Sequence, residues 1–131
     1  MPVPVEFSLK TVGKTDVVEI TSRVESRLGE VESTGGVNLW VPHTTAAVVV
    51  NEAADPDVLA DFVEYISKAV PREASYSHLE GNSAAHIKSI LTGNSQWLPV
   101  VNGKLQLGRW QGLFLLEWDG PRTRKIQLYP G

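Results

Sequence analysis

The stretch Leu98-Pro-Val-Val-Asn-Gly-Lys-Leu-Gln-Leu107 predicts a β-hairpin in the second half of the chain. Its centre is Asn102-Gly103, and these residue types favour a type I′ turn because both central positions of that turn take a positive φ. Apolar residues lie on both sides of the pair, as in two strands that each bury one face. The sheet is therefore expected to be antiparallel at this point.

Runs with the spacing of β-strands also lie toward both ends of the chain. At the start, apolar residues alternate from Val3 to Leu9, and a second run at residues 16–20 follows the Gly13-Lys14 turn. We expect these two runs to form a hairpin, and we expect the last two strands to pair around residues 119–122. The further predicted strands cover residues 37–41, 45–51, 98–101, 104–107, 113–118 and 125–129.

Two segments carry clear signals of a helix start. Ser22 and Glu25 have the spacing of a capping box, which predicts a short helix over residues 21–29. Asp55-Pro56-Asp57 predicts the start of the main amphipathic helix, because it offers a capping carboxylate and a proline in the first turn. Apolar residues then recur at helical spacing until Pro71 ends the run.

A third helix is expected at residues 83–91, where Gly93 provides the stop signal. Helical spacing places Ile87, Ile90 and Leu91 on its buried face. Strands at both ends of the chain and helices grouped between them predict an α+β fold with a largely antiparallel sheet.

The composition bounds the class of protein. A chain of 131 residues is about the length of one domain, and we interpret residues 1–131 as a single domain. Because there is no cysteine, disulfides, thiolate metal ligands and thiol nucleophiles are excluded. The N-terminal residues do not resemble a secretory signal, and no run approaches the ~20 apolar residues of a membrane span. We expect a soluble, cytoplasmic protein with no membrane partner.

The charge argues against nucleic acid as a partner, because the net charge is -3 and the 12 basic residues form no basic block. Four basic residues near the end are suited to one small anion, with ordinary surface charge or a subunit salt bridge as the alternative. They are Arg109, Arg122, Arg124 and Lys125. The four tryptophans are expected to pack in the core or in an interface.

The three histidines suggest a metal site. His78 and His86 flank the start of the third helix, and His43 opens the segment His43-Thr44-Thr45 between two predicted strands. Three imidazoles are a typical ligand set of a catalytic zinc ion, whose fourth position is left for water or substrate. The spacing of His78 and His86 does not match two ligands on one helical turn, so hydrogen-bonded structural histidines are the alternative.

The start of the third helix suggests an anion site. Free backbone N–H groups near Asn82, Ser83 and Ala84 suit a phosphate or carboxylate, unless Asn82 or Ser83 only caps the helix. Glu80 lies close enough in sequence to act as a general base, a fourth ligand or an orienting group, or it is an exposed loop residue. Further acids near strand ends, each alternatively solvated or turn-forming, are Glu52, Glu117 and Asp119.

Several motifs together resemble one known family. The second half carries Ser95-Gln-Trp-Leu-Pro-Val-Val-Asn-Gly-Lys-Leu-Gln-Leu-Gly-Arg-Trp-Gln111 and Glu117-Trp-Asp-Gly-Pro-Arg122. The first half carries His43-Thr-Thr-Ala46, Asn51-Glu52, Asp55-Pro-Asp57 and His78-Leu-Glu-Gly-Asn-Ser-Ala-Ala-His86. Over nearly the whole chain this pattern is similar to the YjbQ-like proteins, often labelled secondary thiamine-phosphate synthases. Arg109 departs from it, since that family usually has threonine there.

The resemblance implies an α+β fold, a largely antiparallel β-sandwich with central helices, that assembles as a homotrimer. It also implies zinc, or magnesium for a diphosphate substrate, held by His43, His78 and His86. Glu80 and Glu52 are the implied acid–base residues. The implied substrate- or anion-binding residues are Thr44, Asn82, Ser83, Arg109 and Gln111.

Three functions remain open from the sequence. The first is an enzyme that joins a pyrimidine diphosphate to a thiazole phosphate and releases diphosphate, as the family label implies. The second is a metal-dependent hydrolase of phosphoesters with Glu80 as base. The third is a trimer that binds metal or anions without catalysis. The expected partners are a phosphorylated small molecule and further copies of the same chain.

Overall fold

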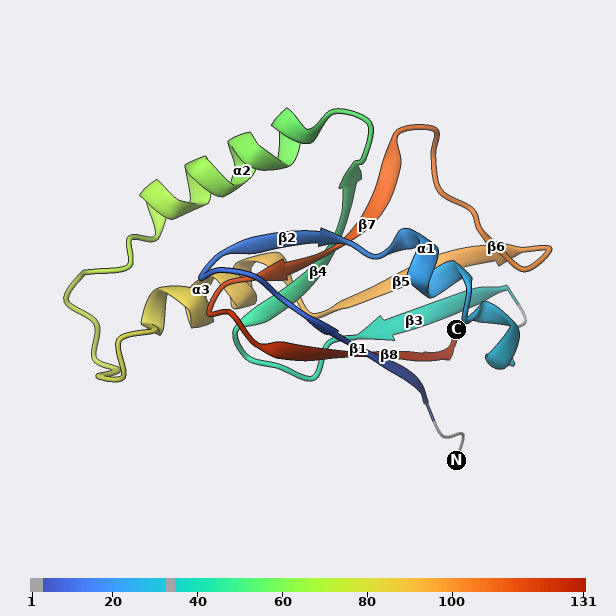
Figure 1. Ribbon diagram of the computed structural model, residues 1–131, viewed down its shortest axis with the longest axis horizontal. Helices are drawn as coiled ribbons and strands as arrows, with labels where there is room; N and C mark the ends of the chain where they lie inside the picture. The colour runs from blue at the N-terminus through green and yellow to red at the C-terminus, as the bar shows by residue number, and fades with distance from the viewer. Residues whose placement is uncertain (1–3, 33–34) are drawn as a thin grey trace.

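The computed structural model describes residues 4–32 and 35–131, and in these residues it contains eight β-strands, three α-helices and one short 3-10 helix (Figure 1). The strands are β1 (Val5–Lys10), β2 (Asp16–Glu19), β3 (Gly36–Trp40), β4 (Ala46–Glu52), β5 (Ser95–Val101), β6 (Lys104–Leu105), β7 (Gln111–Glu117) and β8 (Thr123–Pro130). The helices are α1 (Thr21–Glu25), η1 (Leu28–Glu30), α2 (Pro56–Ala69) and α3 (Ser83–Thr92). Val3, the predicted start of the first strand, lies outside the described residues.

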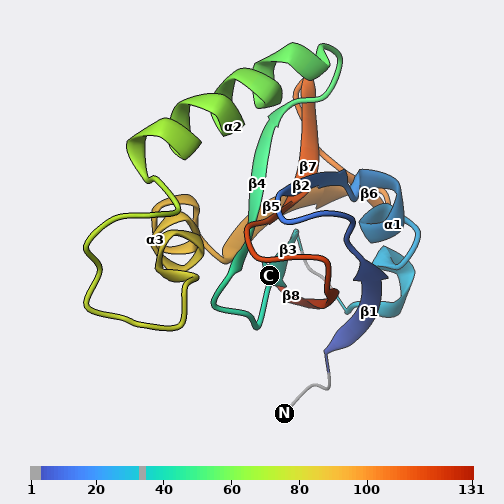
Figure 2. The ribbon, with the colours of Figure 1, turned by 60° about the vertical axis from the view of Figure 1, so that its left-hand side comes forward.

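The strands form two antiparallel sheets. One has five strands in the order β1-β8-β3-β5-β6, and the other has three in the order β2-β7-β4. The helices α2 and α3 both lie on the outer side of the three-stranded sheet, as Figure 2 shows. The predicted α+β class and the antiparallel β-sandwich are therefore confirmed.

The alternation of side chains along β7 explains the layers. Leu113 and Leu115 point into the core between the two sheets, whereas Leu116 points to the opposite face, where α2 and α3 pack. Because both faces of β7 are covered, its sequence reads as a continuous apolar run. Each fully buried leucine contributes on the order of 1.5–3 kcal/mol of transfer free energy.

The two terminal hairpins expected from the sequence do not form. β1 pairs with β8, and β2 pairs with β7, so β1 and β2 lie in different sheets. β7 and β8 are split in the same way. The strands themselves were predicted correctly, but short turns between apolar runs do not distinguish a hairpin from a crossing between stacked sheets.

The central hairpin does form. Asn102 and Gly103 have φ values of 51° and 74°, as a type I′ turn requires, and β5 pairs with β6 across them. The second strand is shorter than predicted, since β6 ends at Leu105.

Helix α2 begins as predicted, because the Asp55 side chain accepts a hydrogen bond from the Asp57 amide at 2.9 Å. The predicted capping box of α1 is absent, and Ile20 is the residue before that helix. In α3 the predicted burial is wrong for Ile90 and Leu91, which are 81% and 65% exposed, whereas Ile87 packs against the core as predicted. The helix instead turns its small residues toward the sheet.

No helix in the described ranges is long and apolar enough to cross a membrane.

Candidate functional site

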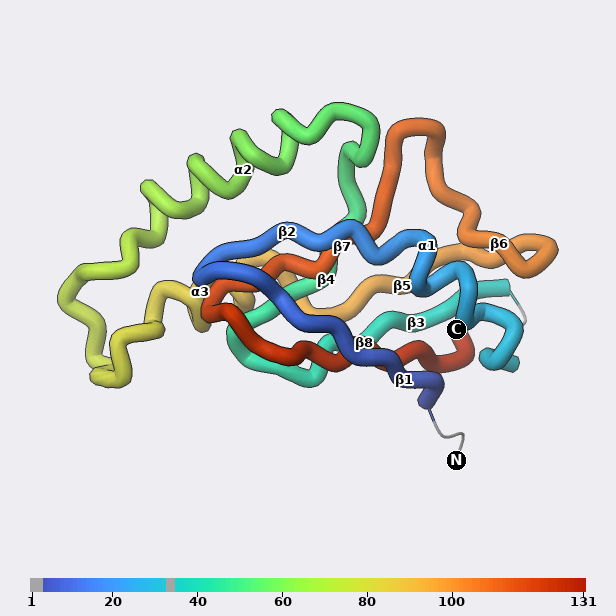
Figure 3. Tube along the Cα trace, in the orientation of Figure 1, coloured from blue at the N-terminus to red at the C-terminus, as the bar shows by residue number. Residues whose placement is uncertain are grey.

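Three connections between the two sheets meet at one end of the sandwich. They join β1 to β2, β3 to β4 and β7 to β8, and Figure 3 shows the first and last of these bends side by side near α3. The Thr11 amide donates to the Arg122 carbonyl at 2.9 Å, and the Trp118 amide donates to the Thr45 carbonyl at 3.1 Å. Hydrogen bonds between these loops thus hold together the places where the chain passes from one sheet to the other.

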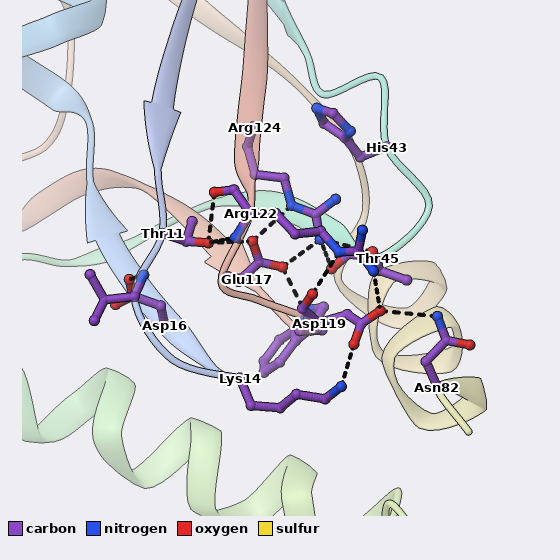
Figure 4. A network of polar contacts seen from close by, with 12 residues as sticks. Thr11, Lys14, Asp16, His43, Thr45, Asn82, Glu117, Asp119, Arg122 and Arg124 are labelled. Atoms are coloured by element: carbon purple, nitrogen blue, oxygen red, sulfur yellow. Dashed lines mark hydrogen bonds and ion pairs between the residues drawn. The ribbon is translucent and has the colours of Figure 1, made fainter. Parts of the chain in front are cut away.

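A buried ion pair joins β7 to β8 beneath these loops (Figure 4). Arg124 donates from both Nε and Nη2 to the Glu117 carboxylate, with Nε at 2.8 Å from Oε1. The Nη2 atom also donates to the carbonyl and hydroxyl oxygens of Thr45, at 3.1 and 2.8 Å. Thr11 donates its hydroxyl to Glu117 at 2.7 Å. The exposed fractions of Glu117 and Arg124 are 0% and 3%.

These donors set the ionisation of Glu117. Burial alone would raise the pKa of its carboxyl, but the hydrogen bonds from Arg124, Thr11 and the Asp119 amide outweigh burial and lower it. Glu117 is therefore a carboxylate throughout the neutral range, and it fixes Arg124 in one orientation.

Asp119 forms a second polar cluster beside the first. Its carboxylate accepts hydrogen bonds from Lys14, from Asn82 Nδ2 at 3.0 Å and from Arg122 Nη2 at 3.0 Å. Burial would raise the pKa of Asp119, but these three donors hold it at about 2. Asp119 therefore ties the β1–β2 loop and the start of α3 to Arg122.

Gly120 permits this close meeting of loops. A Cβ atom at this position would lie 2.4 Å from the Gly13 carbonyl oxygen and 2.8 Å from Glu117 Cγ. Neither contact is compatible with normal packing, so the β7–β8 crossing needs a residue without a side chain here.

A cavity of about 650 Å³ opens above these clusters, and we call it the candidate pocket. Its walls come from the β3–β4 loop, the start of α3 and β8. The lining residues with polar side chains include His43, Thr44, Asn82, His86, Arg122 and Arg124, with Glu80 at the edge. The structure thus brings five of the predicted site residues, His43, Thr44, Glu80, Asn82 and His86, to one cavity, and the roles assigned to them stay predictions.

His43 is held in one tautomer. Its Nε2 atom accepts a hydrogen bond from the Lys125 amide at 2.9 Å, so Nδ1 carries the proton of the neutral ring. Burial lowers the pKa of His43, and the nearby Arg124 lowers it further. His43 therefore presents a neutral imidazole to the candidate pocket.

The three histidines do not form the predicted metal site. His78 Nδ1 lies 2.9 Å from the Ser83 hydroxyl, and the His78 ring meets the His86 ring edge to face with centroids 5.2 Å apart. His78 does not line the candidate pocket. Nowhere in residues 4–32 and 35–131 do three His, Asp or Glu side chains gather in a group that could hold a metal ion.

The other predicted site residues lie elsewhere. Glu52 and Gln111 are opposite each other at the far ends of β4 and β7, six residues from the Ala46–Glu117 pair. At about 3.3 Å per residue, that separation is roughly 20 Å. Arg109 lies over the Trp110 ring, and Ser83 is buried against His78. The functional roles assigned to these residues stay predictions.

The buried pair of Glu117 and Arg124 was not predicted, although the sequence carried a signal for it. Glu117 follows Leu113 and Leu115 in the inward phase of β7, and Arg124 precedes Ile126 and Leu128 in the inward phase of β8. A charged residue at a buried position of a strand needs a partner of opposite charge, and Glu117 and Arg124 are partners of each other.

A family model described as "UPF0047 protein YjbQ-like" matches residues 5–129. Among named relatives, a UPF0047 protein of Methanocaldococcus jannaschii is 43% identical over 122 residues, which are 92% of this chain and 88% of that protein. The UPF0047 protein YugU of Bacillus subtilis is 46% identical over 120 residues, covering 90% of this chain and 91% of that one.

These comparisons correct the function predicted from the sequence. The relatives are named only as UPF0047 proteins, with no synthesis of thiamine phosphate and no metal-dependent reaction attached to them. Together with the histidines that do not gather into a ligand group, this overturns the metal-binding thiamine-phosphate synthase and its metal-dependent alternatives. The predicted zinc or magnesium cofactor, the homotrimer and the cytoplasmic location stay predictions.

Solved structures show the same fold. A conserved hypothetical protein from Thermus thermophilus superposes with a TM-score of 0.90 at 43% identity, covering 97% of this chain and 99% of that chain. A YjbQ/UPF0047 protein from Clostridium acetobutylicum superposes with a TM-score of 0.89 at 44% identity, covering 95% and 97%. The chain therefore belongs to the YjbQ-like UPF0047 family.

Proposed function

We propose that the protein binds a small anionic molecule in the candidate pocket and transfers a proton to or from it with His86. The observation that carries the proposal is the meeting of two anchored arginines and two histidines in one cavity of about 650 Å³. That volume is in the range of small-molecule sites.

The two arginines support the binding of an anion. Arg122 and Arg124 use Nε and Nη2 to reach Asp119, Glu117 and Thr45, and in the described part of the chain neither Nη1 atom has a hydrogen-bond partner. Guanidinium groups suit carboxylate and phosphate oxygens. Because the protein already fixes both groups, binding an anion costs little side-chain entropy.

His86 supports the transfer of a proton. Its ring lines the candidate pocket and, within the described ranges, its nitrogens make no hydrogen bond. A ring nitrogen without a protein partner is available to a ligand as donor or acceptor. The neutral His43 adds an Nδ1–H donor from the β3–β4 loop. These groups fit proton transfer at an atom next to a carboxylate or phosphate.

We also propose that copies of the chain associate with each other, as the homotrimer prediction expects. Large apolar side chains stay exposed in the monomer, and such residues often mark interfaces. They include Trp40, Trp97, Trp110, Ile90 and Leu91. Light scattering of the purified protein gives the oligomer size, and a monomer at all concentrations contradicts this proposal.

Exchange of hydrogen with heavy water tests the proton transfer. We expect the protein to catalyse the incorporation of deuterium into at least one member of a panel of 2-hydroxy acids, 2-keto acids and their phosphate esters. Proton NMR measures this incorporation as the loss of the substrate's proton signal. His86→Gln is expected to slow this exchange by about 100-fold or more, since general acid–base groups contribute about 10²–10⁴-fold.

His78→Gln is the matched control, because His78 is the neighbouring imidazole and does not line the pocket. It is expected to retain most of the exchange. Wild-type protein that exchanges hydrogen in no member of the panel, or a His86→Gln variant as active as wild type, contradicts the proposed function.

A further inference from the structure

A second cavity lies on the other side of the start of α3. Its volume is about 210 Å³, and we call it the Lys88 cavity. It is lined by three basic side chains, those of Lys14, Arg72 and Lys88, and none of its described lining residues is an aspartate or glutamate. Asn82 lines both this cavity and the candidate pocket, so the two lie back to back.

Lys88 has a largely buried side chain, and no carboxylate of the described residues pairs with it. Only 8% of its surface is exposed, and in the described residues its Nζ atom makes no hydrogen bond and no ion pair. Nζ lies over the Trp118 ring, 5.3 Å from the centroid. Lysines buried to this extent are almost always paired with a negative group.

The first turn of α3 adds donors to the same cavity. The helix has ten residues and no side-chain cap at its start, because Asn82 directs its amide group to Asp119. The Ala85 and His86 amides donate to the Asn82 carbonyl, whereas those of Ser83 and Ala84 have no acceptor in the described ranges. Unpaired N–H groups at a helix start attract anions. Of the two residues with a free amide, Ala84 lines the cavity and Ser83 directly precedes it.

Lys14 and Arg72 bring two further charges from different elements. Lys14 comes from the β1–β2 loop, where its ammonium group binds Asp119 and stays 44% exposed. Arg72 follows the end of α2, is exposed, and makes no ion pair within the described residues. Helix α3 and the loop after α2 thus direct unpaired positive charge at one small volume, and Lys14, paired with Asp119, lines the same cavity.

We propose that the Lys88 cavity binds a phosphate group, held by Lys88, Arg72 and the free amides at the start of α3. A phosphate carries up to two negative charges and accepts several hydrogen bonds, which matches this set of donors. The group is either free inorganic phosphate or the end of a phosphomonoester. This site is separate from the candidate pocket and does not depend on the function proposed there.

Nitrogen–proton correlation spectra of the full chain test the proposal. We expect inorganic phosphate, added at constant ionic strength with sodium chloride, to shift the amide resonances of Ser83, Ala84 and Lys14 in a saturable way. Glycerol phosphate forms the second arm. Saturation by inorganic phosphate alone assigns the free anion, and tighter binding of the ester assigns a phosphomonoester.

Lys88→Met is expected to weaken the binding of phosphate by at least tenfold. Lys68→Met is the matched control, because Lys68 lies on the exposed face of α2 and pairs only with Glu64. It should bind phosphate like wild type. Arg72→Gln changes an exposed residue and leaves the core intact, and it should weaken the binding of phosphate by at least threefold. This variant tests the site if Lys88→Met does not fold.

Arg122→Gln distinguishes binding of phosphate in the Lys88 cavity from binding in the candidate pocket, since Arg122 does not line the Lys88 cavity. It should leave the phosphate-induced shifts near Ala84 unchanged. The proposal is overturned if phosphate produces no saturable shift around the start of α3, or if both Lys88→Met and Arg72→Gln bind phosphate as tightly as wild type.

Discussion

Arg124, near the start of β8, forms an ion pair with Glu117, the last residue of β7, between the two sheets. The alternation of side chains along each strand assigns both positions to the core. The pair lies under the three loops that carry the chain from one sheet to the other. It therefore has two consequences: it stabilises the crossing of the chain, and it holds one guanidinium group at the base of the candidate pocket.

Removing one member of the pair should cost more stability than removing both. Glu117→Gln leaves the buried Arg124 without its counter-charge, and we expect the free energy of unfolding to fall by about 3 kcal/mol or more in urea denaturation. The double variant Glu117→Met with Arg124→Met should recover part of that loss, because two apolar residues leave no charge uncompensated.

Glu73→Gln is the control, since Glu73 is an exposed loop residue. It should change stability by less than about 0.5 kcal/mol. A Glu117→Gln variant that is as stable as wild type shows that the ion pair does not hold the crossing.

Asp119 should make the stability depend on pH in acid. Its pKa is about 2 in the folded chain, below the ordinary value, so the folded state binds the proton less readily than the unfolded state. Stability from this group is present above about pH 4 and is lost as the pH falls toward 2. Chemical denaturation at pH 2, 3, 4 and 5 measures the slope.

Asp119→Asn removes this titration and should flatten the dependence on pH between 2 and 4. Asp61→Asn, on the exposed face of α2, should leave the slope as in wild type. Equal slopes for wild type and Asp119→Asn contradict the depressed pKa.

Gly120→Ala should disrupt the β7–β8 crossing, because its Cβ would lie 2.4 Å from the Gly13 carbonyl oxygen. We expect a loss of about 1–3 kcal/mol, as is typical when an atom is forced into a packed site. Gly29→Ala is the matched control, since no atom lies within 4 Å of a Cβ built there. If thermal melting shows the two alanine variants to be equally stable, the close packing at Gly120 does not matter.

His43 should have a pKa below that of an ordinary histidine, and its neutral ring should carry the proton on Nδ1. Burial and Arg124 both lower its pKa, and Nε2 accepts the Lys125 amide. Long-range nitrogen–proton spectra of the imidazoles distinguish both the charge and the tautomer. A His43 pKa at or above that of an ordinary histidine, or a proton on Nε2 of the neutral ring, is inconsistent with this geometry.

Features that depend on residues close together in the sequence were predicted, whereas features that depend on distant residues were not. The type I′ turn at Asn102-Gly103 and the cap at Asp55 depend on residues close in sequence, and both were predicted correctly. The pairing of β1 and β2 was not, because it depends on which sheet each strand joins. A crossing between stacked sheets and a hairpin both need only a short turn between apolar runs.

The candidate site shows the same division. His43, Glu80 and His86 were selected by residue type and motif, and the structure brings them to one pocket. His78 pairs with Ser83 and does not line the pocket, and this depends on side-chain geometry that spacing does not specify. The burial of Lys88 was also missed, because helical spacing assigned the buried face to Ile90 and Leu91.

The most direct test of the central claim is a titration of the wild type and of Arg122→Gln with malonate, a small dicarboxylate, followed by nitrogen–proton spectra. We predict saturable shifts of His43, Thr44 and His86 in wild type and binding at least tenfold weaker in Arg122→Gln, since a hydrogen bond to a charged group contributes about 1.5–3 kcal/mol. Arg23→Gln, at the end of α1, should bind like wild type. Equal affinities of wild type and Arg122→Gln, or no shift at these three residues, would contradict an anion site in the candidate pocket.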